Sequence, residues 1–155
     1  MKNNFENLDG IIKDHKHFYR LRVFYEDTDA GQIVYHTNYL KYFERARSSL
    51  LNLLKIDQLK LKKEDDTILV VKKVDVNWYK PAKLNDILLI KTCLKYAKNS
   101  SITLNQDVYK YVSSNNHIVL LVSGVIQIVA INSLHKVKKM NTILNHKFFQ
   151  NKSYR

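Results

Sequence analysis

Residues 38 to about 54 carry apolar side chains at the spacing of an amphipathic helix. The members of the apolar stripe are Tyr39, Phe43, Ala46, Leu50 and Leu54. Spacings of three and four residues put side chains on one face of an α-helix, and polar residues fill most of the opposite face here. Thr37 or Asn38 can serve as the N-cap. We therefore expect one long helix that buries this stripe.

Five other segments are expected to be β-strands, because they are rich in β-branched and aromatic residues and are separated by turn-forming residues. They cover residues 18–25, 68–79, 87–96, 102–112 and 117–131. In the second segment the apolar and polar side chains alternate, with Val74, Val76 and Trp78 on one face and Lys73, Asp75 and Asn77 on the other. This alternation is typical of a sheet with one wet face. Short connectors between the last four segments predict antiparallel pairing.

One helix stripe and one apolar sheet face must cover each other, which predicts an α+β domain. We expect a curled antiparallel sheet of about five strands around one long central helix, formed by residues 17–131. Residues 1–16 are polar and are expected to form an N-terminal extension. Residues 132–155 are basic and form either a loose tail or a packing helix, since Val137, Met140, Ile143 and Leu144 could share a stripe.

The chain has 155 residues, which suits a single domain, and a single cysteine. Cys93 is expected to be a buried strand residue, and a catalytic thiol is the less favoured interpretation. The first residues include no apolar signal region, so we expect a cytoplasmic protein. Residues 118–131 are too short and too β-branched for a membrane-spanning helix, and they are assigned to a central strand.

The net charge of +12 would favour polyanions, including nucleic acid, CoA phosphates and an acidic carrier protein. Lysine accompanies asparagine along the whole chain, however, which indicates a compositional bias more than a designed patch. No zinc-ligand spacing or RNA-binding motif is present, so we predict neither a metal site nor nucleic-acid binding. A non-enzymatic polyanion-binding protein stays open as an alternative function.

The segment 25–39 combines residue types that suit catalysis. Three carboxylates, Glu26, Asp27 and Asp29, precede Gly31, and Tyr35 and His36 follow just before the expected helix. Free N–H groups and the positive end of the helix dipole then lie near a carboxylate, a layout that can stabilise an oxyanion. Acidic residues before a helix also commonly form turns or balance the helix dipole, so the pattern alone leaves both interpretations open.

The sequence YEDTDAGQIVYHTNYL at residues 25–40, followed by FERAR at 43–47, closely resembles the signature of acyl-CoA thioesterases associated with the Tol-Pal system. These enzymes are part of the 4-hydroxybenzoyl-CoA thioesterase-like family. Residues 74–86, with Pro81 and Ala82, resemble the same family more weakly. The resemblance implies the hot-dog fold, hydrolysis of acyl-CoA to a free acid and CoA, no cofactor, and a homodimer or homotetramer with sites at the interface between copies.

Residue roles follow from the resemblance by position. Asp29 is the expected catalytic carboxylate, acting as nucleophile or as general base, and Asp27 is expected to brace the loop. Tyr35, His36 and Asn38 are the expected substrate-binding residues, and an N–H near His36 is the expected oxyanion donor. His36 could instead be a general base.

Further residues are considered for binding the CoA phosphates and for the helix surface. The phosphates of CoA need cations, for which Lys72, Lys73, Lys80 and Lys83 are candidates, although a solvated basic face would explain each of them equally well. Glu44 is expected to pair with a neighbouring arginine on the helix surface. Another hot-dog activity, on acyl-carrier-protein thioesters, is an alternative. The hydratases of this fold usually carry histidine in a loop rich in proline and glycine, whereas this chain has only three glycines and one proline.

Overall fold

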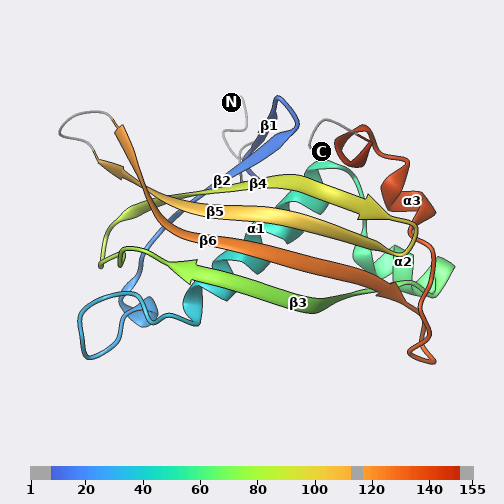
Figure 1. The fold of residues 1–155 in the computed structure, drawn as a ribbon, viewed down its shortest axis with the longest axis horizontal. Helices are drawn as coiled ribbons and strands as arrows, with labels where there is room; N and C mark the ends of the chain where they lie inside the picture. Colours follow the sequence, from blue (N-terminus) through green and yellow to red (C-terminus); the bar gives the residue numbers. More distant parts are fainter. Residues whose placement is uncertain (1–7, 113–116, 151–155) are drawn as a thin grey trace, which may run out of the picture.

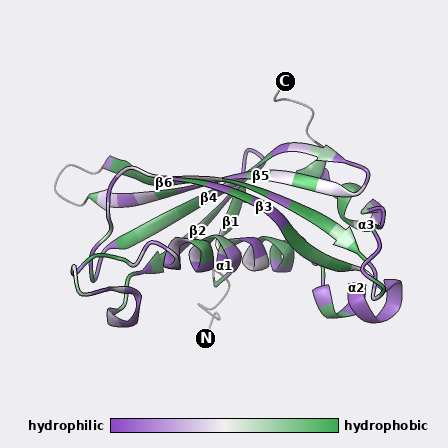
Figure 2. Cartoon of the chain, turned by 60° about the horizontal axis from the view of Figure 1, so that its bottom comes forward, coloured by the Kyte–Doolittle hydropathy of each residue, from purple (hydrophilic) through white to green (hydrophobic). Residues whose placement is uncertain are grey.

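The computed structural model describes residues 8–112 and 117–150, and it consists of one curved antiparallel sheet with a long helix against one face (Figures 1 and 2). The expected turn at 113–116 and both chain ends lie outside the described residues. The strands are β1 (Ile11–Lys13), β2 (Lys16–Arg22), β3 (Ile68–Trp78), β4 (Ile87–Lys98), β5 (Ser101–Val112) and β6 (His117–Ile131). The helices are η1 (Tyr25–Asp27), α1 (Asn38–Leu53), α2 (Gln58–Asp65), α3 (Asn141–Leu144) and η2 (Lys147–Phe149).

Helix α1 is the expected central helix, and it buries the expected stripe against the sheet. Tyr39, Phe43, Ala46 and Leu50 are all almost fully buried. Gly124 of β6 lies directly beneath Phe43, where an added Cβ would come within 2.7 Å of the ring atom Cε2. The missing side chain therefore allows the helix to lie close to the centre of the sheet.

The strand order is β1-β2-β4-β5-β6-β3. The expected α+β architecture is confirmed, with short β1 added to the predicted strands. Strands β4, β5 and β6 pair in sequence as predicted, but the expected pairing of β3 with β4 is wrong. β3 pairs with β6 instead, because residues 79–86 carry the chain across the end of the sheet, and no other strand of the described residues pairs with its second edge. This connection is held by the N–H of Val34, which donates to the carbonyl of Ala82 at 2.9 Å.

The sequence pattern missed α2. Its N-terminus is capped by Asp57, whose carboxylate accepts from the N–H groups of Leu59 and Lys60 at 2.8 and 3.1 Å. Only Leu61 of this helix is buried, so no apolar stripe announces it, and Figure 2 shows it as largely hydrophilic. The N-cap at Asp57, and not an apolar face, therefore determines where this helix forms.

The segment after β6 packs against the domain as far as it is described. Met140, Ile143, Phe148 and Phe149 are at most 4% exposed. Their burial favours the packing alternative for residues 132–150 over a loose tail. At the other end of the chain, β1 forms an exposed hairpin with β2 within residues that were expected to be only a polar extension.

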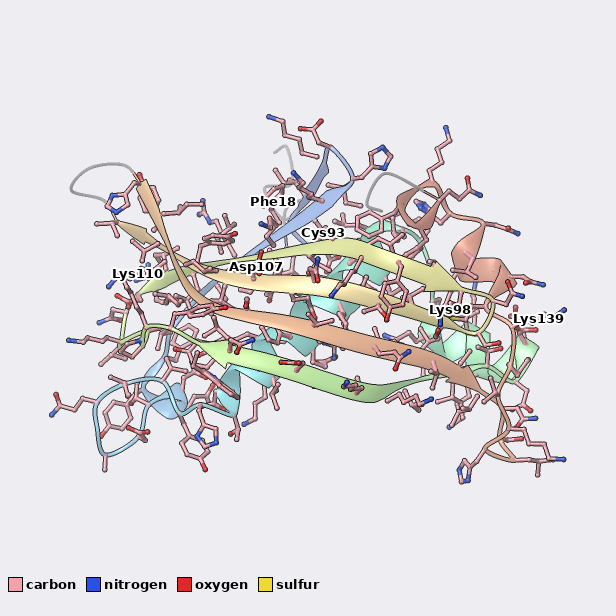
Figure 3. The ribbon with its side chains drawn as sticks, viewed as in Figure 1. Phe18, Cys93, Lys98, Asp107, Lys110 and Lys139 are labelled. Atoms are coloured by element: carbon pink, nitrogen blue, oxygen red, sulfur yellow. The ribbon has the colours of Figure 1, made fainter. Side chains whose placement is uncertain are left out.

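The sheet face opposite α1 carries polar pairs. Lys91 of β4 forms a salt bridge with Asp107 of β5 at 2.9 Å and a hydrogen bond with the Tyr109 hydroxyl at 2.8 Å. Cys93 lies on β4 near Asp107 (Figure 3). Burial raises the pKa of the Cys93 thiol, which keeps it protonated and unreactive at neutral pH. These features agree with a strand residue and not with a nucleophile.

Candidate active site

The loop before α1 is built on the buried carboxylate of Asp27. Its Oδ2 accepts from the N–H of Phe24 at 2.8 Å, and its backbone carbonyl accepts from the N–H of Tyr35 at 2.9 Å. The side-chain amide of Asn38 donates to the same carbonyl at 2.8 Å. Burial, followed by the nearby Asp27 carboxylate, raises the pKa of Tyr42, so that its hydroxyl stays protonated beneath the loop. Asp27 and Asn38 therefore brace the loop from inside.

Asp29 lies at the exposed tip of this loop, in a tight turn. Its N–H donates to the carbonyl of Ile33 at 3.0 Å, and its Oδ1 accepts from the N–H of Gly31 at 2.8 Å. A Cβ at Gly31 would come within 3.0 Å of that same oxygen, so glycine leaves room for the carboxylate. Among the described residues, Oδ2 of Asp29 has no hydrogen-bond partner. One carboxylate oxygen is thus held in place while the other stays available to a ligand.

A surface hollow of about 510 Å³ opens beside Asp29. It is lined by Tyr25, Thr28, Asp29, Ala30, Gln32, Lys83 and Leu84. The structure therefore brings Lys83 into the same hollow as Asp29. Lys80 follows the end of β3 and is exposed, whereas Lys73 alternates with Val74 and so lies on the sheet face opposite α1.

The N-terminus of α1 lies a few residues beyond Asp29. Within the described part of the chain, the N–H groups of His36 and Thr37 have no acceptor, and Thr37 provides no side-chain cap. The carbonyl of His36 accepts from Nε1 of Trp78 at 3.3 Å, which ties the start of the helix to the end of β3. Free N–H groups at a helix N-terminus attract negative charge, so this position suits an oxyanion.

Aromatic rings stand around this helix start. The ring of His36 lies 4.6 Å from that of Tyr35 and 6.0 Å from that of Trp78, both in edge-on contact. Tyr35 is 45% exposed and Trp78 is 48% exposed. Trp78 was not expected to be a site residue, because the sequence pattern shows only that it lies on the apolar face of a strand.

The α1 side of the free β3 edge also leaves apolar side chains uncovered. Val71, Val74 and Trp78 of β3 are exposed there, as is Leu40 on the neighbouring face of α1. Glu44 accepts a hydrogen bond from the Ser48 hydroxyl at 2.6 Å, while Arg47 donates to Gln106 at 2.9 Å. The expected pairing of Glu44 with an arginine is an electrostatic interaction with Arg47, and no direct salt bridge joins these two described side chains.

Residues 8–112 and 117–150 contain no cluster of three or more side chains suited to hold a metal ion. No helix in these ranges has the length and hydropathy to cross a membrane.

Residues 31–113 match the family model described as the thioesterase superfamily. The chain is 42% identical over 86 residues to a Haemophilus influenzae protein named acyl-CoA thioesterase YbgC, and 38% identical over 90 residues to a Helicobacter pylori protein of the same name. The first alignment covers 56% of this chain and 63% of the relative, and the second covers 58% and 65%. The match thus spans slightly less than two thirds of each relative.

Solved structures share the fold over most of the chain. A probable thioesterase from Bartonella henselae is 27% identical, with a TM-score of 0.72 over 81% of this chain and 98% of that one. A 1,4-dihydroxy-2-naphthoyl-CoA thioesterase from Synechocystis, at 17% identity, gives 0.77 over 90% and 99%. The 4-hydroxybenzoyl-CoA thioesterase of a Pseudomonas species, at 15%, gives 0.74 over 81% and 93%. These likenesses confirm the hot-dog fold, and the family match shows that the chain belongs to the thioesterase superfamily.

Proposed function

We propose that this protein hydrolyses acyl-CoA thioesters, with Asp29 as the catalytic carboxylate. The observation that carries the proposal is the exposed Asp29 carboxylate, with one oxygen fixed by Gly31 and the other unpartnered among the described residues, in a surface hollow on the loop that leads into the α1 N-terminus. The names of the relatives support the same reaction.

The thioester carbonyl oxygen accepts hydrogen bonds from the N–H of His36 or Thr37 as negative charge develops on it. Loss of one such donor typically lowers kcat by about 100-fold to 1,000-fold. Asp29 either attacks the carbonyl carbon itself, which gives an anhydride that water then opens, or takes a proton from the attacking water. In both routes the C–S bond breaks, and CoA leaves as a thiolate that is then protonated.

Tyr35 and His36 are proposed to line the acyl side of this site. The ring contacts of His36 with Tyr35 and Trp78 support a packing role, and a general-base role for His36 is the alternative. Replacing His36 with alanine separates the two. If His36 only packs, His36→Ala should lower kcat/KM less than Asp29→Asn does. If His36 is a general base, the two variants should lower kcat/KM equally.

For the CoA phosphates, Lys83 is the best placed of the proposed lysines, because it lines the hollow that holds Asp29. Lys80 and Lys73 are also proposed to contact the CoA phosphates, at the Asp29 hollow of a neighbouring copy of the chain. Contacts of this kind predict that KM rises with salt concentration. Asn38 is proposed to act on substrate only through the loop that it braces.

A homodimer or homotetramer is part of the proposal. Its support is the free edge of β3 together with the exposed Val71, Val74 and Trp78 on its α1 side, which a second copy would cover. An association with the Tol-Pal system is proposed from the sequence resemblance alone, and a cytoplasmic location stays a prediction from the sequence.

The proposal is tested by incubating the protein with a panel of acyl-CoA esters and acyl-carrier-protein thioesters. The release of free thiol and the mass of the acid product are measured. We expect CoA and the free acid in equal amounts. Turnover of carrier-protein thioesters alone would favour the alternative substrate. Binding of RNA without release of thiol from any ester would favour the polyanion-binding alternative and contradict the proposal.

A further inference from the structure

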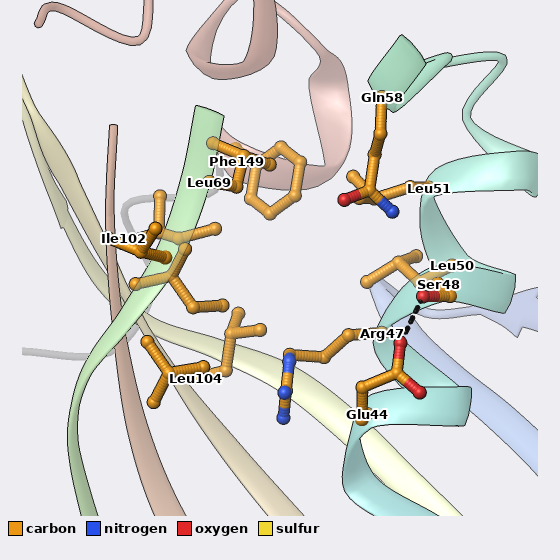
Figure 4. Close-up of a pocket in the computed structure, with 13 residues that line it drawn as sticks. Glu44, Arg47, Ser48, Leu50, Leu51, Gln58, Leu69, Ile102, Leu104 and Phe149 are labelled. Carbon is orange, nitrogen blue, oxygen red and sulfur yellow. Dashed lines mark hydrogen bonds between the residues drawn. The ribbon is translucent and has the colours of Figure 1, made fainter. Parts of the chain in front are cut away.

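An apolar cavity of about 180 Å³ lies between α1 and the β3 side of the sheet, away from the Asp29 hollow. Leu50 and Leu51 form its helix wall, and Leu69, Ile102, Leu104 and Ile128 form its sheet wall. Figure 4 shows Phe149 beside Leu69 at one end and Glu44 and Arg47 at the other. A cavity of about 150 Å³ lined by Leu, Ile and Phe can stay dry and bind benzene, so this one, which Ser48 and Gln58 also line, has the volume for a hydrocarbon group of about six carbons.

The cavity and the Asp29 site lie along the same pair of elements. β3 runs antiparallel to α1, because Trp78 contacts His36 at the start of the helix while Leu69 and Leu51 meet in the cavity. On α1, Glu44 lines the cavity, and Leu40 lies one helical turn before it on the same side of the helix. Trp78, Val74 and Val71 of β3 therefore form an apolar side that leads from the helix start to the cavity, while α1 adds the polar Glu44 and Arg47 between Leu40 and Leu51.

The exposed side chains between the two ends are apolar. Val74 and Val71 of β3 and Leu40 of α1 are each about two-fifths exposed or more. We call Trp78, Val74, Val71 and Leu40 the acyl track, of which Val71 also lines the cavity, and in the proposed oligomer the tail runs between this track and the copy that covers it. The polar side chains at the near end of the cavity are already engaged, with Glu44 bonded to Ser48 and Arg47 bonded to Gln106. A hydrocarbon chain can therefore pass them without taking away their partners.

The length of the route defines the class of acyl group. From Asn38 to Leu51 the helix rises about 20 Å, at about 1.5 Å per residue. An acetyl group or a single aromatic ring held at the helix N-terminus cannot reach the cavity, whereas an extended long-chain fatty acyl group can.

We propose that the substrate is a long-chain fatty acyl thioester whose hydrocarbon tail follows the acyl track into this cavity, where Phe149 sets the maximum chain length. The proposal rests on thioester hydrolysis at Asp29. Phe149 belongs to η2, which lies beyond residues 31–113 that match the family model.

The experiment measures kcat/KM for straight-chain acyl-CoA esters from butyryl to stearoyl, for the wild type and for Phe149→Trp and Phe149→Ala. We expect wild-type values to rise with chain length, by up to ~4-fold per methylene that becomes buried, and then to level off. Phe149→Trp should lower the ratio of longest-chain to butyryl kcat/KM at least tenfold, and Phe149→Ala should shift the plateau to longer chains.

Phe148→Ala is the matched control, because Phe148 is equally buried and packs edge-on against Phe149 at 5.1 Å but does not line the cavity. Its chain-length ratio should match that of the wild type. Val71→Trp, on the exposed edge strand, is a second obstruction of the track should Phe149→Trp fail to fold, and the same fall in ratio is expected.

Two results would overturn the proposal while leaving thioester hydrolysis intact. One is a wild-type preference for butyryl-CoA, and the other is a chain-length ratio that stays constant in the Phe149 and Val71 variants. Failure to hydrolyse any acyl-CoA would instead remove the proposed function, and this inference with it.

Discussion

Replacing Asn38 with alanine tests whether this side chain braces the loop or touches the substrate. Asn38 is 6% exposed, and its amide donates to the Asp27 carbonyl at 2.8 Å. A buried hydrogen bond of this kind contributes about 1 kcal/mol. The Asp27 carbonyl keeps its second donor, the N–H of Tyr35 at 2.9 Å, so the larger penalty for an unpartnered buried group does not apply. We expect the free energy of unfolding to fall by about 1 to 2 kcal/mol.

Activity should fall along with stability, because the same carbonyl fixes Tyr35 and therefore the spacing between Asp29 and the helix start. We expect a lower kcat with a small change in KM. Urea denaturation and steady-state kinetics measure the two effects. Asn52→Ala is the control on the same helix, since its amide makes only a surface contact of 3.3 Å with Asp9, and its unfolding free energy should stay within about 0.5 kcal/mol of the wild type.

The reasoning is refuted if Asn38→Ala unfolds like the wild type but raises KM severalfold. That combination would mean that Asn38 contacts the substrate directly and that other bonds hold the loop.

Three further predictions concern the core, the sheet edge and pH. Gly124→Ala should lower the unfolding free energy by about 1 to 3 kcal/mol, because its Cβ would meet Phe43 at 2.7 Å, and Phe43→Leu in the same chain should recover part of this loss in urea denaturation. Val74→Lys on the α1 side of β3 should dissociate the oligomer in sedimentation velocity, whereas Asp75→Lys on the opposite face should not, and equal behaviour of the two would contradict the assigned interface. Burial lowers the pKa of His17 below its unfolded value of about 6.5, so the folded state favours the neutral imidazole. The contribution of His17 to the unfolding free energy is therefore complete above about pH 6.5 and is lost as the pH falls through the lowered pKa. Unfolding free energy should therefore drop more steeply from pH 7 to 5 in the wild type than in His17→Gln, and parallel slopes would count against this explanation.

The parts of the fold that were predicted are those with a local periodic signal. Helix α1 and strands β4 to β6 each bury one face, so their apolar spacing could be interpreted directly from the sequence. The place of β3 was predicted wrongly because strand order depends on contacts between distant residues, and residues 79–86 are long enough to cross the sheet end. Helix α2 was missed because its stability comes from the Asp57 cap and not from an apolar stripe.

The site divides in the same way. The pattern placed a carboxylate before a helix N-terminus, and the family resemblance is the reason that Asp29 is proposed as the reacting group. The bracing of the loop by Asn38, the bond from Trp78 to His36 and the closure of the cavity by Phe149 all join residues far apart in the chain. None of them leaves a local signal, and so only the structure could bring them together.

The central claim is that the Asp29 carboxylate carries out thioester hydrolysis, and comparison of kcat for the wild type and Asp29→Asn on one saturating acyl-CoA ester tests it most directly. The amide keeps the size of the side chain and an oxygen for the Gly31 N–H, so circular dichroism and the urea midpoint should not change. We expect kcat to fall at least about 100-fold, while Asp75→Asn, which changes an exposed carboxylate on the opposite sheet face, retains wild-type turnover. A folded Asp29→Asn protein that keeps most of its kcat would contradict the claim.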